Sequence, residues 1–452
     1  MTAAGTDRSA APERSVGRTR WVRLIPVAVV VYVISFMDRT NISFAFDGLG
    51  RELGISKAQQ GLAGGVFFLG YLVLQIPGGH LAERWSAKRF VTIMIVAWGV
   101  FALASGVVQT FTQLLVVRLL LGVAEGGIWP AILVLISHWF PTRERARAFG
   151  IWMMNIPISS IITAPLSGWI LSFSDWRGLF FIQGALPFVI ALPLWLWLVA
   201  DRPSRARWVS GAERAWIETE LARDEVDAPP VAGYGAVFRS GLVWRLVAVY
   251  FLIQVGFYGL TLWLPTLLKA TTGGNSVLVG WLTAIPYLVA VVAMYLNARA
   301  ADRNRRYGFH VMVSLVVGAV ALVGSVALGS VAAASIVLVC VATAGVLAYD
   351  GPFWASASLA VPAALAGGAM GLVNALGNLG GFVGPYVGGY LQDLSGGSFL
   401  STSIVLAVAL LLGGAVMLTV RGRANPGREA AAAEPADTAD TAGTAARTEP
   451  AP

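Results

Sequence analysis

The sequence predicts an all-α membrane protein with twelve transmembrane helices in two pseudo-symmetric six-helix bundles. Of the 452 residues, 57% are hydrophobic and only 12% are charged, and the mean hydropathy is +0.71. A soluble domain carries about 25% charged residues. Apolar runs of about 20 residues, the length that crosses a bilayer as a helix, recur along the chain. Lipid is therefore the expected solvent for most of this protein.

The apolar runs predict crossings in the following order: 22–46, 58–81, 90–108, 111–138, 145–172, 177–200, 243–268, 277–298, 309–328, 331–358, 365–392 and 397–420. The segment before the first crossing lacks the apolar core and cleavage site of a signal peptide. We therefore expect an uncleaved first helix and both termini on one side. The predicted divisions are a polar N-terminal segment, a first bundle, a linker loop, a second bundle and a disordered tail: 1–20, 21–200, 201–242, 243–421 and 422–452.

The basic residues predict which side holds the termini. Of 32 Lys and Arg residues, 26 fall in the termini and in the loops on the side of the termini, and four fall on the other side. Lys and Arg accumulate in cytoplasmic loops. The net charge of +8 is therefore a topology signal that places both termini in the cytoplasm, and we expect no nucleic-acid partner. Inside the linker, Ser210 and Glu213 predict a capped helix near 210–225.

The sequence argues against metal, redox and enzyme chemistry. The single cysteine, Cys340, excludes an intrachain disulfide, and three scattered histidines make no plausible metal site. No nucleotide-binding loop or activated nucleophile is present. We expect no cofactor, with protons as the coupling ion.

The two halves of the chain repeat short motifs. The loop 79–89 after the second crossing and the loop 298–306 after the eighth both contain an acid-Arg pair followed by further bases. The fifth crossing contains Ala164-Pro165-Leu166-Ser167-Gly168, and the eleventh contains Gly384-Pro385-Tyr386-Val387-Gly388. These repeats indicate two related six-helix units. We interpret both Pro-containing helices as closely packed, bendable gating helices rather than as a mark of antiport.

These features resemble the major facilitator superfamily, over about residues 20–420. Its loop motif matches residues 79–89, except that Glu83 replaces Asp and Ser86 replaces Gly. Further segments resemble the anion:cation symporter family within it: Asp38-Arg39-Thr40-Asn41, Gln75-Ile76-Pro77-Gly78-Gly79, residues 118–126 and Trp139-Phe140-Pro141. The resemblance implies uptake of organic anions such as sugar acids, tartrate and aromatic carboxylates, mostly with protons. It also implies proton sites at Asp38 and Glu125, and cavity positions for Tyr71, Trp354 and Asn374.

Four ionisable residues lie within predicted helices, where each costs ~2.5 to 3.5 kcal/mol or more. They are Asp38, Arg39, Arg118 and Glu125. One interpretation is a set of ion pairs that only braces the first bundle. The other is function: burial favours a neutral carboxyl group and a nearby Arg favours a charged one, so an acid that competes with substrate for one Arg would couple proton binding to occupancy.

A substrate carboxylate is best held by the planar fork of an arginine. Arg39 is the first candidate, and Arg118 either binds substrate or pairs with Glu125 on its own helix. The predicted substrate-binding residues are Arg39, Tyr71, Gln75, Arg118, Asn155, Trp354 and Asn374. The alternative role for the polar members of this set is hydrogen bonding between helices, worth ~0.6 to 2 kcal/mol. Phe353 is also expected to face the cavity, whereas the sequence leaves Asp350 either in the cavity or at a solvated helix end.

The repeated loops supply the expected gating residues: Gly79, Glu83, Arg84, Lys88, Arg89, Asp302 and Arg303. Together these features predict a monomeric transporter of the inner membrane that takes up an organic carboxylate with protons by alternating access. The alternatives are an organic-anion exchanger or an efflux antiporter. A membrane sensor is disfavoured because the chain offers no soluble signalling module beyond the linker and the tail.

Overall fold

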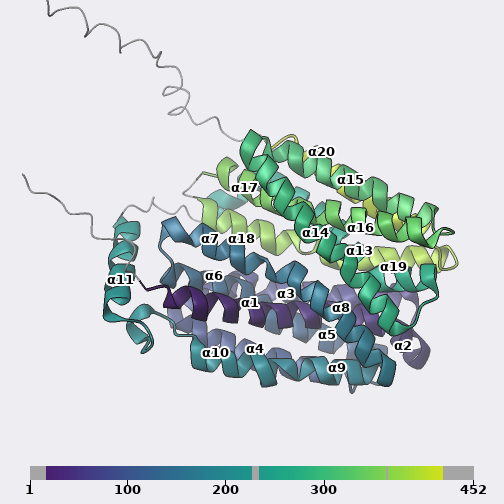
Figure 1. Cartoon of the computed structure of the whole chain (residues 1–452), viewed down its shortest axis with the longest axis horizontal. Coiled ribbons are helices and arrows are strands. Elements are labelled where there is room, and N and C mark those ends of the chain that lie inside the picture. Colours follow the sequence, from purple (N-terminus) through teal and green to yellow (C-terminus); the bar gives the residue numbers. More distant parts are fainter. Residues whose placement is uncertain (1–16, 227–233, 363–364, 421–452) are drawn as a thin grey trace, which may run out of the picture.

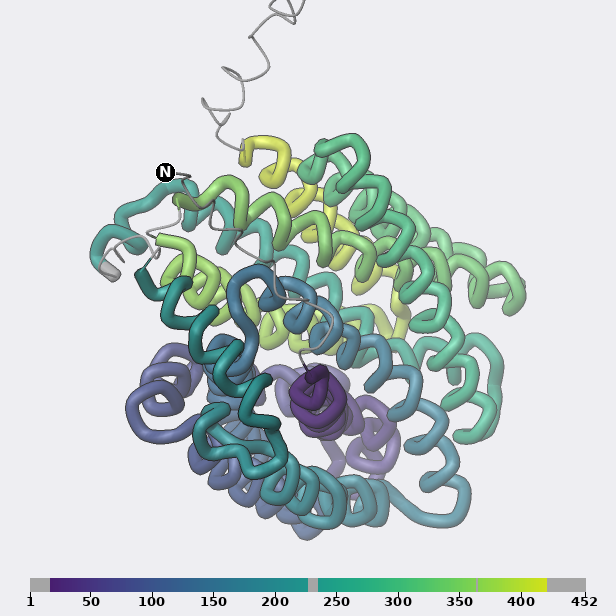
Figure 2. The backbone as a smooth tube through the Cα atoms, turned by 60° about the vertical axis from the view of Figure 1, so that its left-hand side comes forward, coloured from purple at the N-terminus to yellow at the C-terminus, as the bar shows by residue number. Residues whose placement is uncertain are grey.

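The computed structural model describes residues 17–226, 234–362 and 365–420. All regular secondary structure in this part of the chain is helical. The predicted tail 422–452 and most of the N-terminal segment lie outside the described residues. In Figure 1 the first crossings form the lower layer and the last crossings the upper layer, and Figure 2 shows the same separation after a turn of the view. The all-α fold predicted from the sequence is confirmed.

The helices of the first half and the linker have the following bounds: α1 (Thr19–Thr40), α2 (Ile42–Leu53), α3 (Lys57–Leu81), α4 (Ala87–Ala104), α5 (Phe111–Gly126), α6 (Ile128–Trp139), α7 (Thr142–Met153), α8 (Asn155–Phe173), α9 (Trp176–Gly184), α10 (Leu192–Leu198), α11 (Gly211–Val226) and α12 (Tyr234–Phe238). The helices of the second half are α13 (Gly241–Thr272), α14 (Ser276–Asn304), α15 (Tyr307–Ala327), α16 (Ala332–Ala348), α17 (Asp350–Ala360), α18 (Ala366–Gly377), α19 (Gly380–Leu394) and α20 (Leu400–Met417).

Ten helical stretches of the described chain are long and apolar enough to cross a membrane. One of them, Lys57–Ala104, holds the second and third predicted crossings, and the chain changes direction at Ser86, whose backbone is extended. The eleventh crossing consists of α18 and α19, each too short to cross alone. Every crossing predicted from the sequence therefore corresponds to one helix or to consecutive helical segments.

Several crossings are interrupted by a single loosened turn near their middle. The breaks fall at Asn41, Gly127, Met154, Tyr349 and Asn378, all with near-helical dihedral angles. A loosened turn leaves backbone groups without their helical partners, and in a membrane these groups need other partners or a cavity. The breaks therefore mark where polar side chains are to be expected inside the bundles.

The linker helix α11 is attached to the first bundle. The side chain of Ser210 accepts a hydrogen bond from the Glu213 N–H at 3.1 Å, so the predicted cap is present. The buried Glu213 carboxylate does not bond back to the Ser210 N–H and instead accepts from Arg20 Nη1 at 2.8 Å. Arg20 also contacts Glu144 at 2.8 Å. This ion network joins the start of α1, the start of α7 and α11.

We call the end of the molecule where α1 begins and α20 ends the terminus face, and the other end the opposite face. Close approaches between the bundles lie toward the opposite face, where α3 meets α19 and α8 meets α14. A Cβ at Gly61 would clash with the carbonyl oxygen of Pro385, and one at Gly168 would clash with that of Ser276. Small residues thus let the backbones touch, which closes the molecule toward this face.

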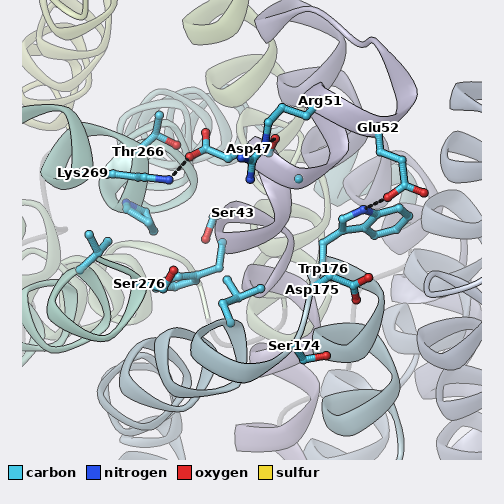
Figure 3. Close-up of a pocket in the computed structure, with 15 residues that line it drawn as sticks. Ser43, Asp47, Arg51, Glu52, Ser174, Asp175, Trp176, Thr266, Lys269 and Ser276 are labelled. Atoms are coloured by element: carbon cyan, nitrogen blue, oxygen red, sulfur yellow. Dashed lines mark hydrogen bonds and ion pairs between the residues drawn. The ribbon is translucent and has the colours of Figure 1, made fainter. Parts of the chain in front are cut away.

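Charged side chains on the opposite face add further links between the bundles. Lys269 of α13 contacts Asp47 of α2 at 2.6 Å, beside a pocket of about 430 Å³ (Figure 3). In the same pocket Glu52 contacts Arg177 at 2.7 Å and accepts a hydrogen bond from Trp176 at 2.6 Å. The first ion pair therefore spans the two bundles, whereas the second joins elements of the first bundle.

Asp393, just beyond the predicted crossing 365–392, caps the start of α3. Its carboxylate accepts from the N–H groups of Lys57 at 3.0 Å and Ala58 at 2.8 Å. Burial alone would raise the pKa of Asp393, but these hydrogen bonds outweigh it and hold the pKa below its ordinary value. The contribution of this contact is therefore complete above the ordinary carboxyl pKa and is lost as the pH falls through the lowered value.

We expect Gly61→Ala to open the opposite face. The new methyl group gains up to about 1 kcal/mol in helix propensity, but overpacking costs about 1–3 kcal/mol, so the clash decides the outcome. The measurement is the rate at which a membrane-impermeant maleimide labels a cysteine at position 43 in a Cys340→Ala background. The control is Gly371→Ala in α18, where a Cβ meets nothing within 4 Å. Equal labelling rates in the two variants would contradict this packing.

We also expect Asp47→Asn to raise the labelling rate of the same cysteine. An exposed ion pair contributes up to about 1 kcal/mol, which limits the increase to about fivefold. Glu52→Gln is the matched control, since it removes a carboxylate from the same pocket without breaking a link between the bundles. A larger effect of Glu52→Gln than of Asp47→Asn would show that the Asp47 pair does not hold the face closed.

Candidate functional site

The break between α1 and α2 is held by Arg118. This buried guanidinium donates to the backbone oxygens of Asp38 at 3.0 Å and Arg39 at 3.1 Å. Carbonyl groups at a helix end lack helical partners, and an arginine fork supplies two donors at once. Arg118 therefore fixes the backbone that presents Arg39. Neither alternative given for Arg118 is seen among the described residues: it forms no ion pair with Glu125, and it is absent from the wall of the central cavity.

Arg39 instead forms the ion pair with Glu125. Its Nη2 lies 3.3 Å from Glu125 Oε2, and its Nη1 donates to the Tyr258 hydroxyl of α13 at 3.2 Å. The same carboxylate oxygen accepts from Ser35 at 2.7 Å, whereas Glu125 Oε1 is buried without a hydrogen-bond partner. The guanidinium also lies over the Tyr71 ring, 4.6 Å from its centroid. Arg39 thus connects the Glu125 carboxylate to the second bundle.

Asp38 points to a different environment from its neighbour Arg39. One carboxylate oxygen accepts from the Trp98 indole of α4 at 2.5 Å, and the other accepts from Asn41 at 3.3 Å. Asp38 is 1% exposed and is absent from the cavity wall. The structure therefore brings Arg39 and Glu125 together and places Asp38 behind them, toward α4.

A narrow central cavity of about 40 Å³ separates the bundles. Of the predicted substrate residues, Arg39, Tyr71, Trp354 and Asn374 line it, and so does Asp350. The remaining predicted residues are buried outside the wall: Gln75, Arg118 and Asn155. Ligand pockets usually measure about 300–1,000 Å³, so an organic ligand requires the bundles to move apart.

The residues that miss the cavity have other partners. Asn155 donates to the Trp152 carbonyl oxygen at 2.6 Å. Phe353, which we expected in the cavity, is buried and stacks on Tyr250 with the ring centroids 5.3 Å apart. Asn155 thus bonds to the backbone of its own crossing and Phe353 packs on α13, and side-chain direction within a crossing is what the sequence pattern left open.

Gln75 and Asn374 take part in a chain of buried amides that crosses between the bundles. Gln75 donates to the Gly126 carbonyl oxygen and accepts from Asn374, both at 3.0 Å. Asn374 accepts from Asn378 at 3.1 Å, and Asn378 accepts from Gln254 at 3.1 Å. The chain ends where the Tyr349 hydroxyl donates to Gln254 at 3.2 Å. It connects the residue after Glu125 with the residue before Asp350.

Sequence reasoning missed most of the wall contributed by α13. Tyr250, Gln254, Phe257 and Tyr258 line the cavity. They recur at the i, i+4, i+7 and i+8 spacing of one helix face. Gln254 belongs to the chain of buried amides, and Tyr258 accepts a hydrogen bond from Arg39. A stripe of aromatic and amide side chains within an otherwise aliphatic crossing was the signal that could have located them.

The loop 79–89 on the terminus face makes its contacts mainly through its second half. Asp201 accepts from the Ser86 hydroxyl at 2.6 Å and from the Lys88 N–H at 2.7 Å, and the Lys88 ammonium donates to Leu196 O. These bonds attach the start of α4 to the end of α10. In the second half of the chain, Asp302 accepts from Tyr307 at 3.2 Å. The remaining predicted gating side chains are exposed: Glu83, Arg84, Arg89 and Arg303.

Gly79 closes the end of α3 against α6. A Cβ at this position would lie 3.3 Å from the Pro130 ring. Gly122 and Gly126 allow the closer approach of α5 to α3, since a Cβ at either would clash with the carbonyl oxygen of Phe67 or Tyr71. This packing brings Glu125 of α5 near the side of α3 that presents Tyr71.

Known proteins resemble the chain over most of its length. The quinolone resistance transporter of Acinetobacter baumannii is 32% identical over 416 residues, which are 88% of this chain and 94% of the relative. A putative tartrate transporter of Agrobacterium vitis is 32% identical over 419 residues, 89% of this chain and 90% of the relative. The D-galactonate transporter of Escherichia coli O6:H1 is 27% identical over 416 residues, 88% of this chain and 94% of the relative.

A solved structure shares the fold. The bacterial homologue of the human lysosomal transporter Spinster, in an inward-facing and occupied conformation, superimposes with a TM-score of 0.70 at 18% identity, covering 89% of this chain and 97% of that chain. The sequence profile of the Major Facilitator Superfamily matches residues 28–385. The resemblance found in the sequence is thereby confirmed: this chain belongs to the Major Facilitator Superfamily, as a multi-pass membrane transporter whose relatives are typical of the anion:cation symporter family.

Proposed function

We propose that the protein is a secondary active transporter that takes up an organic carboxylate together with protons by alternating access. One observation carries the proposal: Arg39 lines the central cavity and is also the ion-pair partner of the buried Glu125, at 3.3 Å. A permanently charged guanidinium is the best protein partner for a carboxylate. The relatives named for tartrate and D-galactonate transport support this class of substrate.

Coupling follows from competition for Arg39. When Glu125 is charged, it holds Arg39, and a substrate carboxylate must displace it. A proton on Glu125 neutralises this competitor and releases the guanidinium for substrate. The unpaired Glu125 Oε1 is a suitable place for that proton, because a buried carboxylate oxygen without a partner is costly while it is charged. Proton and anion therefore favour each other's binding.

Substrate recognition would extend from Arg39 to the polar and aromatic groups of the wall. The Tyr71 and Asn374 side chains offer hydrogen bonds to substrate hydroxyls, and Trp354 offers a ring face for stacking. We assign Gln75, Arg118 and Asn155 to the support of this wall, because their polar groups already bond to backbone oxygens. Arg118 in particular would position Arg39 rather than contact substrate.

The membrane potential sets the number of protons that uptake requires. An anion that enters an inside-negative cell is opposed by about 2.3 kcal/mol per charge per 100 mV. One proton makes the entry of a monovalent anion electroneutral, and two make it driven by the potential. Asp38 is the second candidate carrier. Its buried carboxylate lies one residue from Arg39 and accepts from Trp98 and Asn41, so a change in its charge would act on the α1 break.

We further propose that the terminus face is cytoplasmic and that the protein works as a monomer in the inner membrane. The loops of this face hold the excess of Lys and Arg, which favours the cytoplasmic side. The exposed loop residues would then contact the other bundle when this face closes: Glu83, Arg84, Arg89 and Arg303. Lys88 and Asp302 instead hold the loop backbone through their hydrogen bonds to Asp201 and Tyr307.

The alternative function is organic-anion exchange or efflux by antiport. One observation favours it, namely that a relative 32% identical over 416 residues is named a quinolone resistance transporter. The direction in which a proton gradient moves solute distinguishes the two. In vesicles with an imposed gradient, symport accumulates a carboxylate on the side toward which protons flow, and antiport accumulates it on the other side.

We expect Glu125→Gln to abolish uphill accumulation of substrate while exchange of labelled for unlabelled substrate continues. Glutamine has nearly the same shape as glutamate and keeps an oxygen for Ser35 and Arg39, but its amide cannot take up and release the transported proton. The measurement is uptake into proteoliposomes with and without a pH gradient, beside a counterflow assay. Glu218→Gln on the surface of α11 is the control for the loss of one carboxylate. Proton-driven accumulation in Glu125→Gln would remove Glu125 from the mechanism.

A further inference from the structure

Asp350 is a carboxylate of the cavity wall that the coupling mechanism does not use. It lies at the loosened turn between α16 and α17, and its Oδ1 accepts from the Trp354 indole one turn later, at 3.1 Å. In the described part of the chain Asp350 forms no ion pair, and its carboxylate accepts no second hydrogen bond from the protein. A charged group on the wall of a membrane cavity without a protein counter-ion points to a partner that arrives from the cavity.

The helix start does not account for this acid. An acidic residue in the first turn of a helix stabilises free N–H groups there. At this junction no side chain caps the first turn of α17: the Asp350 carboxylate accepts from the Trp354 indole, and the Phe353 N–H donates to the Tyr349 oxygen at 2.8 Å. Asp350 therefore does not act as a cap.

The surroundings of Asp350 suit a cation. The wall on this side is aromatic and is formed by Tyr250, Phe257, Tyr349 and Trp354. The Trp354 ring is packed against Tyr250, with their centroids 5.2 Å apart, so its position is defined. Aromatic faces attract ammonium groups, and a carboxylate among such faces is a common way in which proteins bind amines.

The cavity therefore has two poles on different bundles. The first bundle contributes Arg39, and the second contributes Asp350 with its aromatic wall. An anion without an amine would bind only at the first pole and would leave Asp350 on the cavity wall without a counter-ion. A solute with a carboxylate at one end and a protonated amine at the other would use both.

We propose that the substrate class is zwitterionic: a carboxylate that also bears an amine, with the carboxylate on Arg39 and the ammonium on Asp350. This inference rests on the proposed function, since it takes the Arg39 contact as given. It assigns Asp350 as a determinant of specificity rather than as a carrier of the transported proton. It also gives the solute a role in bringing the two bundles together, because its ends bind to different bundles.

The test uses matched pairs of carboxylates on aliphatic and aromatic scaffolds of increasing length. One member of each pair carries an amine, and the other carries a methyl group at the same position. Binding is measured on the purified protein as the concentration that gives half of the maximal thermal stabilisation. We expect the amine of at least one pair to bind about tenfold more tightly than its methyl partner, as for a charge-assisted hydrogen bond. In Asp350→Asn this ratio should fall to about one.

Two further variants separate the possible results. Glu218→Gln removes an exposed carboxylate outside the cavity and should leave the ratio unchanged. Arg39→Gln should weaken both members of each pair. An unchanged ratio in Asp350→Asn, or no amine preference in any pair, would overturn the zwitterion assignment. If binding of the methyl members still depended on Arg39, the proposed carboxylate transport would stand; if no carboxylate depended on Arg39, the proposed function itself would fail.

Discussion

The ion pair between Arg39 and Glu125 is the interaction on which the rest of this structure depends. Two charged groups in a membrane interior are tolerated only when they have partners, and here the partners come from several elements at once. Arg118 holds the backbone beneath Arg39, Ser35 donates to Glu125, and Tyr258 extends the contact to the second bundle. A change in the charge of either group must therefore alter both the cavity wall and the contact between bundles.

The helix breaks explain why the polar residues gather at one level. Asn41, Gly127, Tyr349 and Asn378 interrupt crossings that come from both bundles, and each break adjoins Arg39, Glu125, Asp350 or Asn374. A broken turn exposes backbone groups that need donors and acceptors, so polar side chains are favoured there despite the cost of burying them. The amide chain from Gln75 to Tyr349 supplies donors to the carbonyl oxygens of Gly126 and Asn374 and connects the bundles in this closed arrangement.

Motif reasoning found the chemistry of the site better than its geometry. Arg39 and Glu125 stood out because charge inside an apolar run is costly wherever the helix faces. Their pairing was not foreseen: spacing on one helix left Arg118 as a possible partner of Glu125, whereas the packing of α1 against α5 brings Arg39 to it. Asn155 and Phe353 lie outside the cavity wall because of side-chain direction: Asn155 bonds to the Trp152 carbonyl oxygen of its own crossing, and Phe353 stacks on Tyr250.

The sequence alone determined the number and order of the crossings, because the bilayer requires apolar runs of fixed length and its interior penalises charge at every position along them. It also determined which few residues could carry charge inside the membrane. Only the tertiary structure decided which of these residues meet across helices, that Asp38 lies behind the site and that Asp350 faces the cavity. Helix rotation and the close approach of backbones at glycines set these contacts, and both depend on packing between segments far apart in the chain.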